Sequence, residues 1–412
     1  MTFLEVIKEQ DFKSFCDTVS YKSFIQSVEM ANLLKKRGYQ VTYLGLKAEE
    51  TLQVAAVLFS LPMTGGLHME INSGPVSRDK HYLKQFYQEL QSYAKENGAL
   101  ELLVKPYDTY QHFDTTGQPT DQENTALLDD FLSLGYQHDG LLTGYPGGES
   151  DWHYVKDLTD LDEKTLLKSF SKKGRPLVKK AKTFGITLRK LNRDELPLFK
   201  EITSATSDRR DYDNKSLDYY QDFYDSFGDS CEFMVASLNF QDYLAHLEAD
   251  KTKLDQRIEK LQTTIETNNT SEKKQNQLRE LSSQSATFDT RMAEAKEFIG
   301  KYGSQNIVLA GSLFVYTKQE AVYLFSGSYP KFNKFYAPAL LQEHVMLEAI
   351  KRGITSYNLL GITGEFDGSD SVLRFKQNFN GYIIRKMGTF RYYPHPLKYK
   401  FIYYLKKLLR RY

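Results

Sequence analysis

Residues 247–300 carry the clearest structural pattern of the chain. They read LEADKTKLDQRIEKLQTTIETNNTSEKKQNQLRELSSQSATFDTRMAEAKEFIG. Their apolar residues recur every three, four or seven positions along two arms, and the polar residues 268–271 separate the arms. This heptad spacing is typical of coiled coils. Because residues 240–300 contain no proline, we expect two helices there, each of ~29 residues and about 43 Å long. The outer positions of both arms are polar, which favours an antiparallel hairpin that projects from the body. The alternative is a helical insertion that packs on the body.

Helix and strand signals alternate on both sides of this insert. Before it, strands are predicted at residues 41–47, 51–61 and 100–105, and a periodic helix at 80–97. After residue 152, strands are predicted at 153–158, 231–238, 307–316, 321–326, 354–360 and 381–392. Two successive mixed α/β (α+β) units result, over residues 1–151 and 152–384, with the second interrupted by the hairpin. No sequence repeat supports a duplication, which therefore rests on element order.

Composition limits the protein class. The chain has 412 residues, with 54 Lys plus Arg against 53 Asp plus Glu, which excludes a globally basic nucleic-acid binder. Its two cysteines, Cys16 and Cys231, cannot form a disulfide framework. The start lacks a signal-peptide pattern, and the longest apolar run, near residues 54–63, is shorter than the ~18 residues that span a bilayer. We therefore expect a cytoplasmic protein, and the scattered histidines predict no metal site.

Two local stretches are strongly basic. Residues 164–193 hold eleven basic side chains and no acidic one, which predicts a site for phosphates; the alternative is a solvated helix face balanced by acidic neighbours in space. The tail from Lys398 to Tyr412 has six basic residues, no acid, and apolar residues at helical spacing. It is typical of an interfacial helix drawn to anionic lipid; the alternative is a terminal helix docked on the core.

Common catalytic motifs are absent from the sequence. There is no P-loop, HExxH, CxxC or GxSxG pattern, and no glycine loop of the kind that holds the pyrophosphate of CoA. A glycine-containing turn at residues 360–364 follows a predicted strand and precedes Phe375 and Lys376. A lysine in a partly desolvated pocket suits a developing oxyanion, although a surface position is the more frequent one for a lysine.

Several blocks resemble a known family. They are Phe24-Ile25-Gln26-Ser27 with a helix ending Lys35-Lys36-Arg37-Gly38, then Gly74-Pro75, the block KKGRPLVKKAK at 172–182, Tyr336-Ala337-Pro338, YNLLGI at 357–362, and Phe375-Lys376 with Phe379. Their order and content resemble the Fem-type peptidoglycan interpeptide-bridge aminoacyltransferases, a family that includes FemX, FemA, MurM and MurN. The resemblance covers nearly the whole chain. It departs at Met30, where an aromatic residue is usual, and at residues 377–380, where a glycine often follows the phenylalanine.

The resemblance implies two GNAT-like domains, with the segment from about residue 385 to 412 completing the first. It implies alanyl- or seryl-tRNA as co-substrate, no other cofactor, and transfer to the stem-peptide lysine branch of lipid II at the inner leaflet of the membrane. Lys376 would stabilise the oxyanion, and Phe375 would shape and dry the pocket. Arg175 and Lys35 or Lys36 would hold the phosphates of the acceptor.

Three questions stay open at the level of sequence. Asp108, which follows a strand end, is a candidate general base, although a turn-capping role is the commoner one for such an aspartate. The opening block favours a MurN-like enzyme that adds the second branch residue over one that adds the first. Two other classes of protein compete with the enzyme: a non-catalytic tRNA- or membrane-binding protein, and an acyl-CoA-dependent N-acyltransferase.

Overall fold

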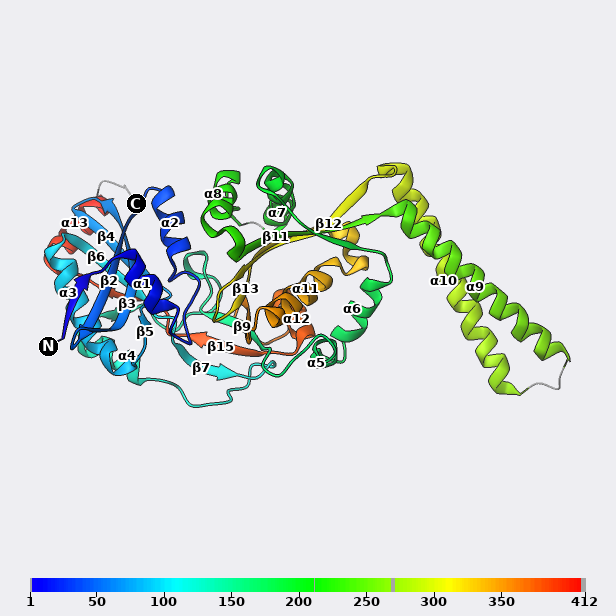
Figure 1. Ribbon diagram of the computed structural model, residues 1–412, viewed down its shortest axis with the longest axis horizontal. Coiled ribbons are helices and arrows are strands. Elements are labelled where there is room, and N and C mark those ends of the chain that lie inside the picture. Colours follow the sequence, from blue (N-terminus) through cyan, green and yellow to red (C-terminus); the bar gives the residue numbers. More distant parts are fainter. Residues whose placement is uncertain (1, 211, 268–270, 409–412) are drawn as a thin grey trace.

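The computed structural model describes residues 2–210, 212–267 and 271–408. Two eight-stranded sheets lie side by side, and a long helical hairpin projects from the second (Figure 1). Within the described ranges, no helix is long and apolar enough to cross a membrane.

The first sheet is mostly antiparallel. Its strands run in the order β1 (Thr2–Val6), β2 (Gln40–Ala48), β3 (Thr51–Met63), β4 (Gly66–Asn72), β6 (Ala99–Lys105), β16 (Phe390–Tyr392) and β8 (Gln137–His138), and β5 (Val76–Ser77) pairs with β3. The parallel pair β4–β6 is joined through α3 (Leu83–Glu96), whose predicted apolar face is buried. The remaining helices of this unit are α1 (Glu9–Cys16), α2 (Val28–Lys36) and α4 (Ala126–Ser133).

The second sheet has helices on both faces. Its order is β10 (Thr187–Lys190), β11 (Cys231–Asn239), β12 (Asn306–Tyr316), β13 (Ala321–Ser328), β14 (Ser356–Ile362), β9 (Trp152–Asp157), β15 (Tyr382–Lys386) and β7 (Thr109–Phe113). One face packs against α6 (Gly174–Lys182) and α11 (Ala337–Lys351), the other against α7 (Leu196–Arg210) and α8 (Leu217–Phe227). Two short helices, α5 (Leu166–Ser169) and α12 (Ser371–Lys376), belong to the same unit.

The strand predicted over residues 381–392 is wrong as a single element. It is two strands, β15 in the second sheet and β16 in the first. Between them Gly388 has a φ of +77°, a left-handed conformation that glycine adopts without strain. β7, which lies within residues 1–151, joins the second sheet, and β16, which lies beyond residue 384, joins the first. The predicted domain boundaries by residue number stay a prediction.

The helical hairpin consists of α9 (Phe240–Thr267) and α10 (Glu272–Tyr302), inserted between β11 and β12. Leu247, Leu254 and Leu281 of the predicted seam are buried, and the Ser285 hydroxyl donates across the seam to Asp255 (2.8 Å). Figure 1 shows both arms leading away from the body, as the heptad pattern predicts. Most of the predicted turn, residues 268–270, lies outside the described residues.

Candidate active site

A cleft of about 2210 Å³ is lined by residues of both units. Strands β13 and β14 form part of its wall. They pair in parallel at Ala321 opposite Tyr357 and Val322 opposite Asn358, and then diverge. Residues 323–328 of β13 and 359–361 of β14, which follow the paired positions, line the cleft. The divergence of two adjacent strands therefore opens the sheet into the cleft.

Lys376 is the last residue of α12 and lines this cleft while being 3% exposed. The helix is anchored by Asp370, whose carboxylate accepts from the backbone N–H groups of Val372 (2.7 Å) and Leu373 (3.1 Å). Its second oxygen accepts from the backbone N–H and the hydroxyl of Thr363, both at 3.0 Å. Asp370 therefore ties α12 to the end of β14 and holds Lys376 in place.

The Lys376 ammonium donates to two carbonyl oxygens of β14, those of Leu360 (2.9 Å) and Gly361 (2.6 Å). An irregularity in the pairing of β14 with β9 lies between Asn358 and Gly361, and Leu360 there has a φ of +58°. Burial lowers the pKa of Lys376 to about 7, opposed by the Asp370 charge and assisted by that of Arg210. Lys376 is therefore a desolvated hydrogen-bond donor that changes protonation near neutral pH.

Phe375 also lines the cleft, and its ring packs edge-on against Phe379 (5.4 Å between centroids). The first turn of α6 packs against the residues that follow Phe375. The backbone of Asn378 lies so close to Gly174 that it leaves no room for a Cβ there. Asn380 has a φ of +55°, a left-handed conformation that asparagine tolerates, so it replaces the glycine expected near this position. The structure thus brings the block at 172–182 against the Phe375–Phe379 segment.

The predicted phosphate ligands lie outside the residues that line the cleft. Lys35 and Lys36 are exposed on α2, next to Glu9 (3.5 Å) and Asp225 (4.0 Å), whereas Met30 and Leu34 of the same helix line the cleft. The Arg175 guanidinium donates to the Phe170 carbonyl (3.1 Å). Leu34 and Gly174, which precede Lys35 and Arg175 in the sequence, line the cleft, but the three predicted cations do not.

Asp108 does not lie with Lys376. It forms an ion pair with Lys80 (2.6 Å) and is not among the residues that line the cleft, although Pro106 and Tyr107 are. Its carboxylate is therefore compensated by a neighbouring cation.

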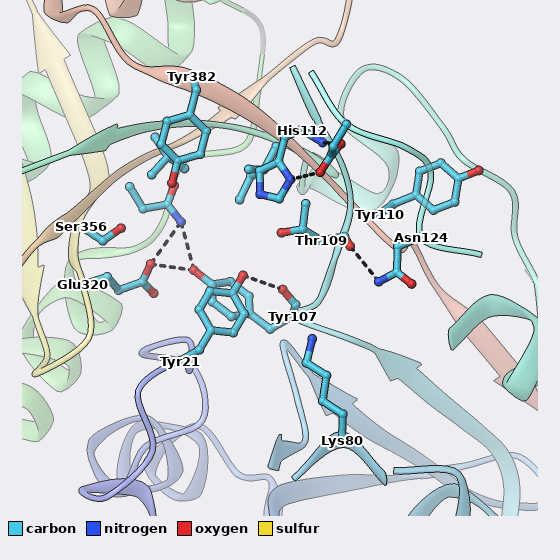
Figure 2. Close-up of a pocket in the computed structure, with 14 residues that line it drawn as sticks. Tyr21, Lys80, Tyr107, Thr109, Tyr110, His112, Asn124, Glu320, Ser356 and Tyr382 are labelled. Atoms are coloured by element: carbon cyan, nitrogen blue, oxygen red, sulfur yellow. Dashed lines mark hydrogen bonds and ion pairs between the residues drawn. The ribbon is translucent and has the colours of Figure 1, made fainter. Parts of the chain in front are cut away.

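A buried polar cluster, not predicted from the sequence, lies at the cleft wall. The Tyr107 hydroxyl donates to Glu320 Oε2 (2.6 Å), and the Asn358 amide nitrogen lies 3.3 Å from the same oxygen. The Lys386 ammonium donates to the Tyr107 carbonyl (2.8 Å) and the Tyr21 hydroxyl (3.0 Å). Figure 2 shows Tyr21, Tyr107 and Glu320 converging from different elements.

The other Glu320 oxygen, Oε1, accepts no hydrogen bond of good geometry among the described residues, although the Phe24 backbone N–H lies near the carboxylate, and the residue is 5% exposed. Burial raises the pKa of Glu320, against the opposing effects of Tyr107, Lys386, Asn358 and the Phe24 backbone N–H. Burial lowers the pKa of Lys386 to about 7. A buried acceptor without a partner costs about 1–3 kcal/mol, so Glu320 Oε1 is an energetically unfavourable group at the cleft wall.

A second, smaller pocket of about 360 Å³ shares Tyr107 and Glu320 with the cleft. In Figure 2 the rings of Tyr21, Tyr107 and Tyr382 surround it together with Glu320. His112 and Asp121, both exposed, hydrogen-bond to each other in its lining. Tyr107 and Glu320 therefore separate two cavities.

Two cations that were not predicted from the sequence also line the cleft. They are Arg209 and Arg210, the last two residues of α7. Both are exposed. The signal in the sequence is a pair of adjacent arginines, which suits a site for an anion. Among the described residues, no cluster of three or more histidine, cysteine, aspartate or glutamate side chains is placed to hold a metal.

Two mixed α/β units, each built on an eight-stranded sheet, enclose a cleft that contains a buried lysine. The crystal structure of FemX matches this fold with a TM-score of 0.75 and 21% identity, over 96% of this chain and 98% of FemX. The FemAB family model matches residues 7–407, so this chain belongs to the FemAB family. The family resemblance and the fold class predicted from the sequence are both confirmed.

This chain also aligns with nearly the full length of two FemA proteins. The aminoacyltransferase FemA of Staphylococcus epidermidis is 27% identical over 390 residues, or 92% of this chain and 93% of FemA. FemA of Staphylococcus aureus strain N315 is equally similar.

Proposed function

We propose that this chain is a peptidoglycan aminoacyltransferase that moves alanine or serine from aminoacyl-tRNA to the stem-peptide lysine branch of lipid II. Membership of the FemAB family and the name of its FemA relatives support the transfer of an aminoacyl group. The observation that carries the proposal is the Lys376 ammonium, buried in the cleft on two carbonyl oxygens of β14.

The proposed reaction is attack of an amine on an aminoacyl ester. The amide nitrogen–carbon bond forms, a tetrahedral oxyanion develops, and the bond from carbon to the ribose oxygen breaks. In its charged form Lys376 stabilises the oxyanion, and its low-dielectric surroundings strengthen that interaction. Phe375 lines the same cleft and helps to exclude water that would hydrolyse the ester.

We assign the proton acceptor to Glu320. Two other buried carboxylates at the cleft are occupied: Asp370 holds α12, and Glu70 contacts His68 (3.2 Å) and Lys105 (3.2 Å). The half-buried Asp151, whose pKa is also raised by burial, lines the same cleft and is the alternative proton acceptor. Glu320 Oε1 accepts no hydrogen bond of good geometry among the described residues. One proton of the acceptor ammonium passes to Glu320, and a second passes from the amine to the leaving ribose oxygen. The smaller pocket gives Glu320 a route for returning its proton to solvent.

The acceptor diphosphate is assigned to Arg209 and Arg210, because planar guanidinium groups bind phosphate oxygens in pairs and both side chains line the cleft. Lys35, Lys36 and Arg175, the phosphate ligands that the family resemblance implies, lie outside the cleft lining and are not needed for this assignment.

The donor tRNA is assigned to α6. Part of the basic stretch is neutralised, since Lys182, Arg189 and Arg193 pair with acidic residues. By contrast, Lys172, Lys173 and Lys179 are exposed and have no acidic partner in the described part of the chain. They lie on or beside the helix whose Gly174 and Leu177 line the cleft, which suits a polyanion whose end enters it.

The test is transfer of labelled alanine or serine from tRNA to two acceptors, unbranched lysine-type lipid II and lipid II that already carries one branch residue. Transfer to the unbranched form assigns the first-residue reaction, and transfer only to the branched form assigns the second. No transfer to either, with tRNA still bound, contradicts the enzymatic function.

A further inference from the structure

Helix α13 (Pro396–Leu408) contains no buried residue. Its largest apolar side chains are among the most exposed in the structure: Leu397 is 83%, Phe401 68% and Leu408 80% exposed. Tyr404 and Leu405 are also exposed. Contiguous apolar surface of this kind marks an interaction site.

The five side chains form one stripe. At about 100° per residue, Leu397, Phe401, Tyr404, Leu405 and Leu408 fall within a sector of roughly 100°. We call this sector the α13 stripe.

The opposite face of the helix holds it to the body. The Ile402 side chain lies directly over Gly65, at the turn between β3 and β4. The Tyr399 ring packs on Tyr393 (4.0 Å between centroids). The α13 stripe therefore faces away from the protein.

Lysines border the stripe. On the same helical projection, Lys398 lies at one edge, and Lys400 and Lys407 lie at the other. The segment 396–408 contains no aspartate or glutamate, and these three lysines form no ion pair with any described residue. The arrangement combines an apolar centre with positively charged edges.

We propose that α13 binds the surface of an anionic lipid bilayer, with the stripe in the boundary between headgroups and acyl chains and the lysines at the lipid phosphates. An interfacial helix buries its apolar face to about 5–10 Å while its charged edges stay in the headgroups. Cationic side chains on both edges complement an anionic surface, and the ring of Tyr404 suits the headgroup level.

In Figure 1, α13 lies at one end of the long axis and the tips of α9 and α10 lie at the other. The helix proposed to bind the bilayer is therefore far from the tip of the hairpin. The inference does not depend on the proposed transfer reaction.

The test is flotation of the full-length protein with vesicles of phosphatidylcholine alone, or of phosphatidylcholine with phosphatidylglycerol. We expect binding to the anionic vesicles that weakens with salt. Combining Leu397→Ser, Phe401→Ser and Leu408→Ser should abolish it. Combining Lys398→Gln, Lys400→Gln and Lys407→Gln should weaken it about 100-fold, since each lysine near such a surface contributes about fivefold.

A matched control removes the same charge elsewhere. Lys172→Gln, Lys173→Gln and Lys179→Gln together, on and beside α6, should leave vesicle binding within twofold of the unmodified protein. Transfer to a water-soluble muropeptide should be unchanged in the α13 variants, which separates failure of this inference from failure of the proposed function.

Undiminished vesicle binding by the serine variant overturns the proposal. A second result also overturns it: the unmodified protein binds no vesicles but self-associates in sedimentation, and the serine substitutions abolish that self-association. The stripe is then an interface between copies of this chain. Circular dichroism of each variant verifies that the surface substitutions leave the fold intact.

Discussion

At the scale of single residues, the site depends on two buried lysines and one buried carboxylate. Lys376 and Lys386 both have a pKa lowered to about 7 by burial, while Glu320 has a raised pKa for the same reason. A buried ionisable group with a shifted pKa at a cleft is typical of an active site. The cost of these shifts appears in the stability of the protein.

Lys376→Met should change how stability depends on pH. Between about pH 7 and the unfolded lysine value near 10.4, the unfolded chain holds the Lys376 proton and the folded chain has lost it, so this lysine makes stability rise with pH. His68, whose pKa is raised to about 9, has the opposite effect, and the difference between variant and parent isolates Lys376. Between pH 7 and 8.5 the free energy of unfolding of the variant should rise by about 1.4 kcal/mol less per pH unit. Urea unfolding at several pH values measures this, and identical slopes would place the titration elsewhere.

Glu320→Gln should slow transfer in a way that depends on the acceptor amine. A lysine side chain with a pKa near 10.4 needs a proton acceptor more than an α-amine with a pKa near 7.7–8.0. We expect kcat to fall about 10²–10³-fold with the lysine acceptor and at least tenfold less with an acceptor that presents an α-amine. Asp108→Asn is the matched control, because Asp108 is paired with Lys80, and its kcat should stay within a few-fold of the parent. An equal loss with both amines would give Glu320 a structural role.

At the scale of elements, periodicity predicted most helices and strands, including α3 and the hairpin seam. It could not separate β15 from β16, because a run of apolar residues does not indicate which sheet each half joins. It also could not predict the contact of Glu320 with Tyr107, since the two are 213 positions apart in sequence and the contact depends on packing of the two units. Lys376 was predicted through a family motif, whereas Arg209 and Arg210 belong to no such motif.

The end of α7 should control binding of the acceptor. Arg209→Gln and Arg210→Gln each remove a guanidinium from the cleft while leaving Lys376 in place. We expect KM for the diphosphate-bearing acceptor to rise about tenfold or more with kcat within threefold, because a charge-assisted pair is worth about 1.5–3 kcal/mol. Arg189→Gln, on an exposed residue paired with Glu195, is the control. Steady-state kinetics with varied acceptor distinguishes these outcomes, and an unchanged KM in both variants would contradict the assignment.

At the scale of the whole molecule, the hairpin extends from the body at a point where β11 and β12 already pair. Its base is anchored by Phe240, which stacks on Phe298 (4.5 Å between centroids), whereas the distal arms bury few side chains. The base of the hairpin belongs to the core of the second unit, so the appendage that the two-sheet body does not need for its own fold is the distal part of the two arms.

Replacing residues 251–289 by a short glycine–serine turn should leave a folded body. We expect its melting temperature to stay within a few degrees of the parent. If the hairpin, which projects from the same unit as α6, contacts the distal part of the donor tRNA, KM for full-length aminoacyl-tRNA should rise several-fold with kcat unchanged. An aminoacylated RNA that ends at the acceptor stem should be used equally well by both proteins. Calorimetry and kinetics with the two donors measure this; loss of folding, or an equal effect on both donors, would show that the hairpin serves the body and not the distal part of tRNA.

The central claim is that Lys376 stabilises the oxyanion. Its most direct test is the single-turnover rate of transfer at saturating donor and acceptor, across pH 6–9, for the parent, Lys376→Met and Lys376→Arg. We predict a loss of about 10²–10³-fold in the methionine variant with unchanged acceptor affinity. In the parent, the contribution of the charged lysine should fall as pH rises through about 7, and the arginine variant, which stays charged, should lack that dependence. A methionine variant that transfers at the parental rate would contradict the account.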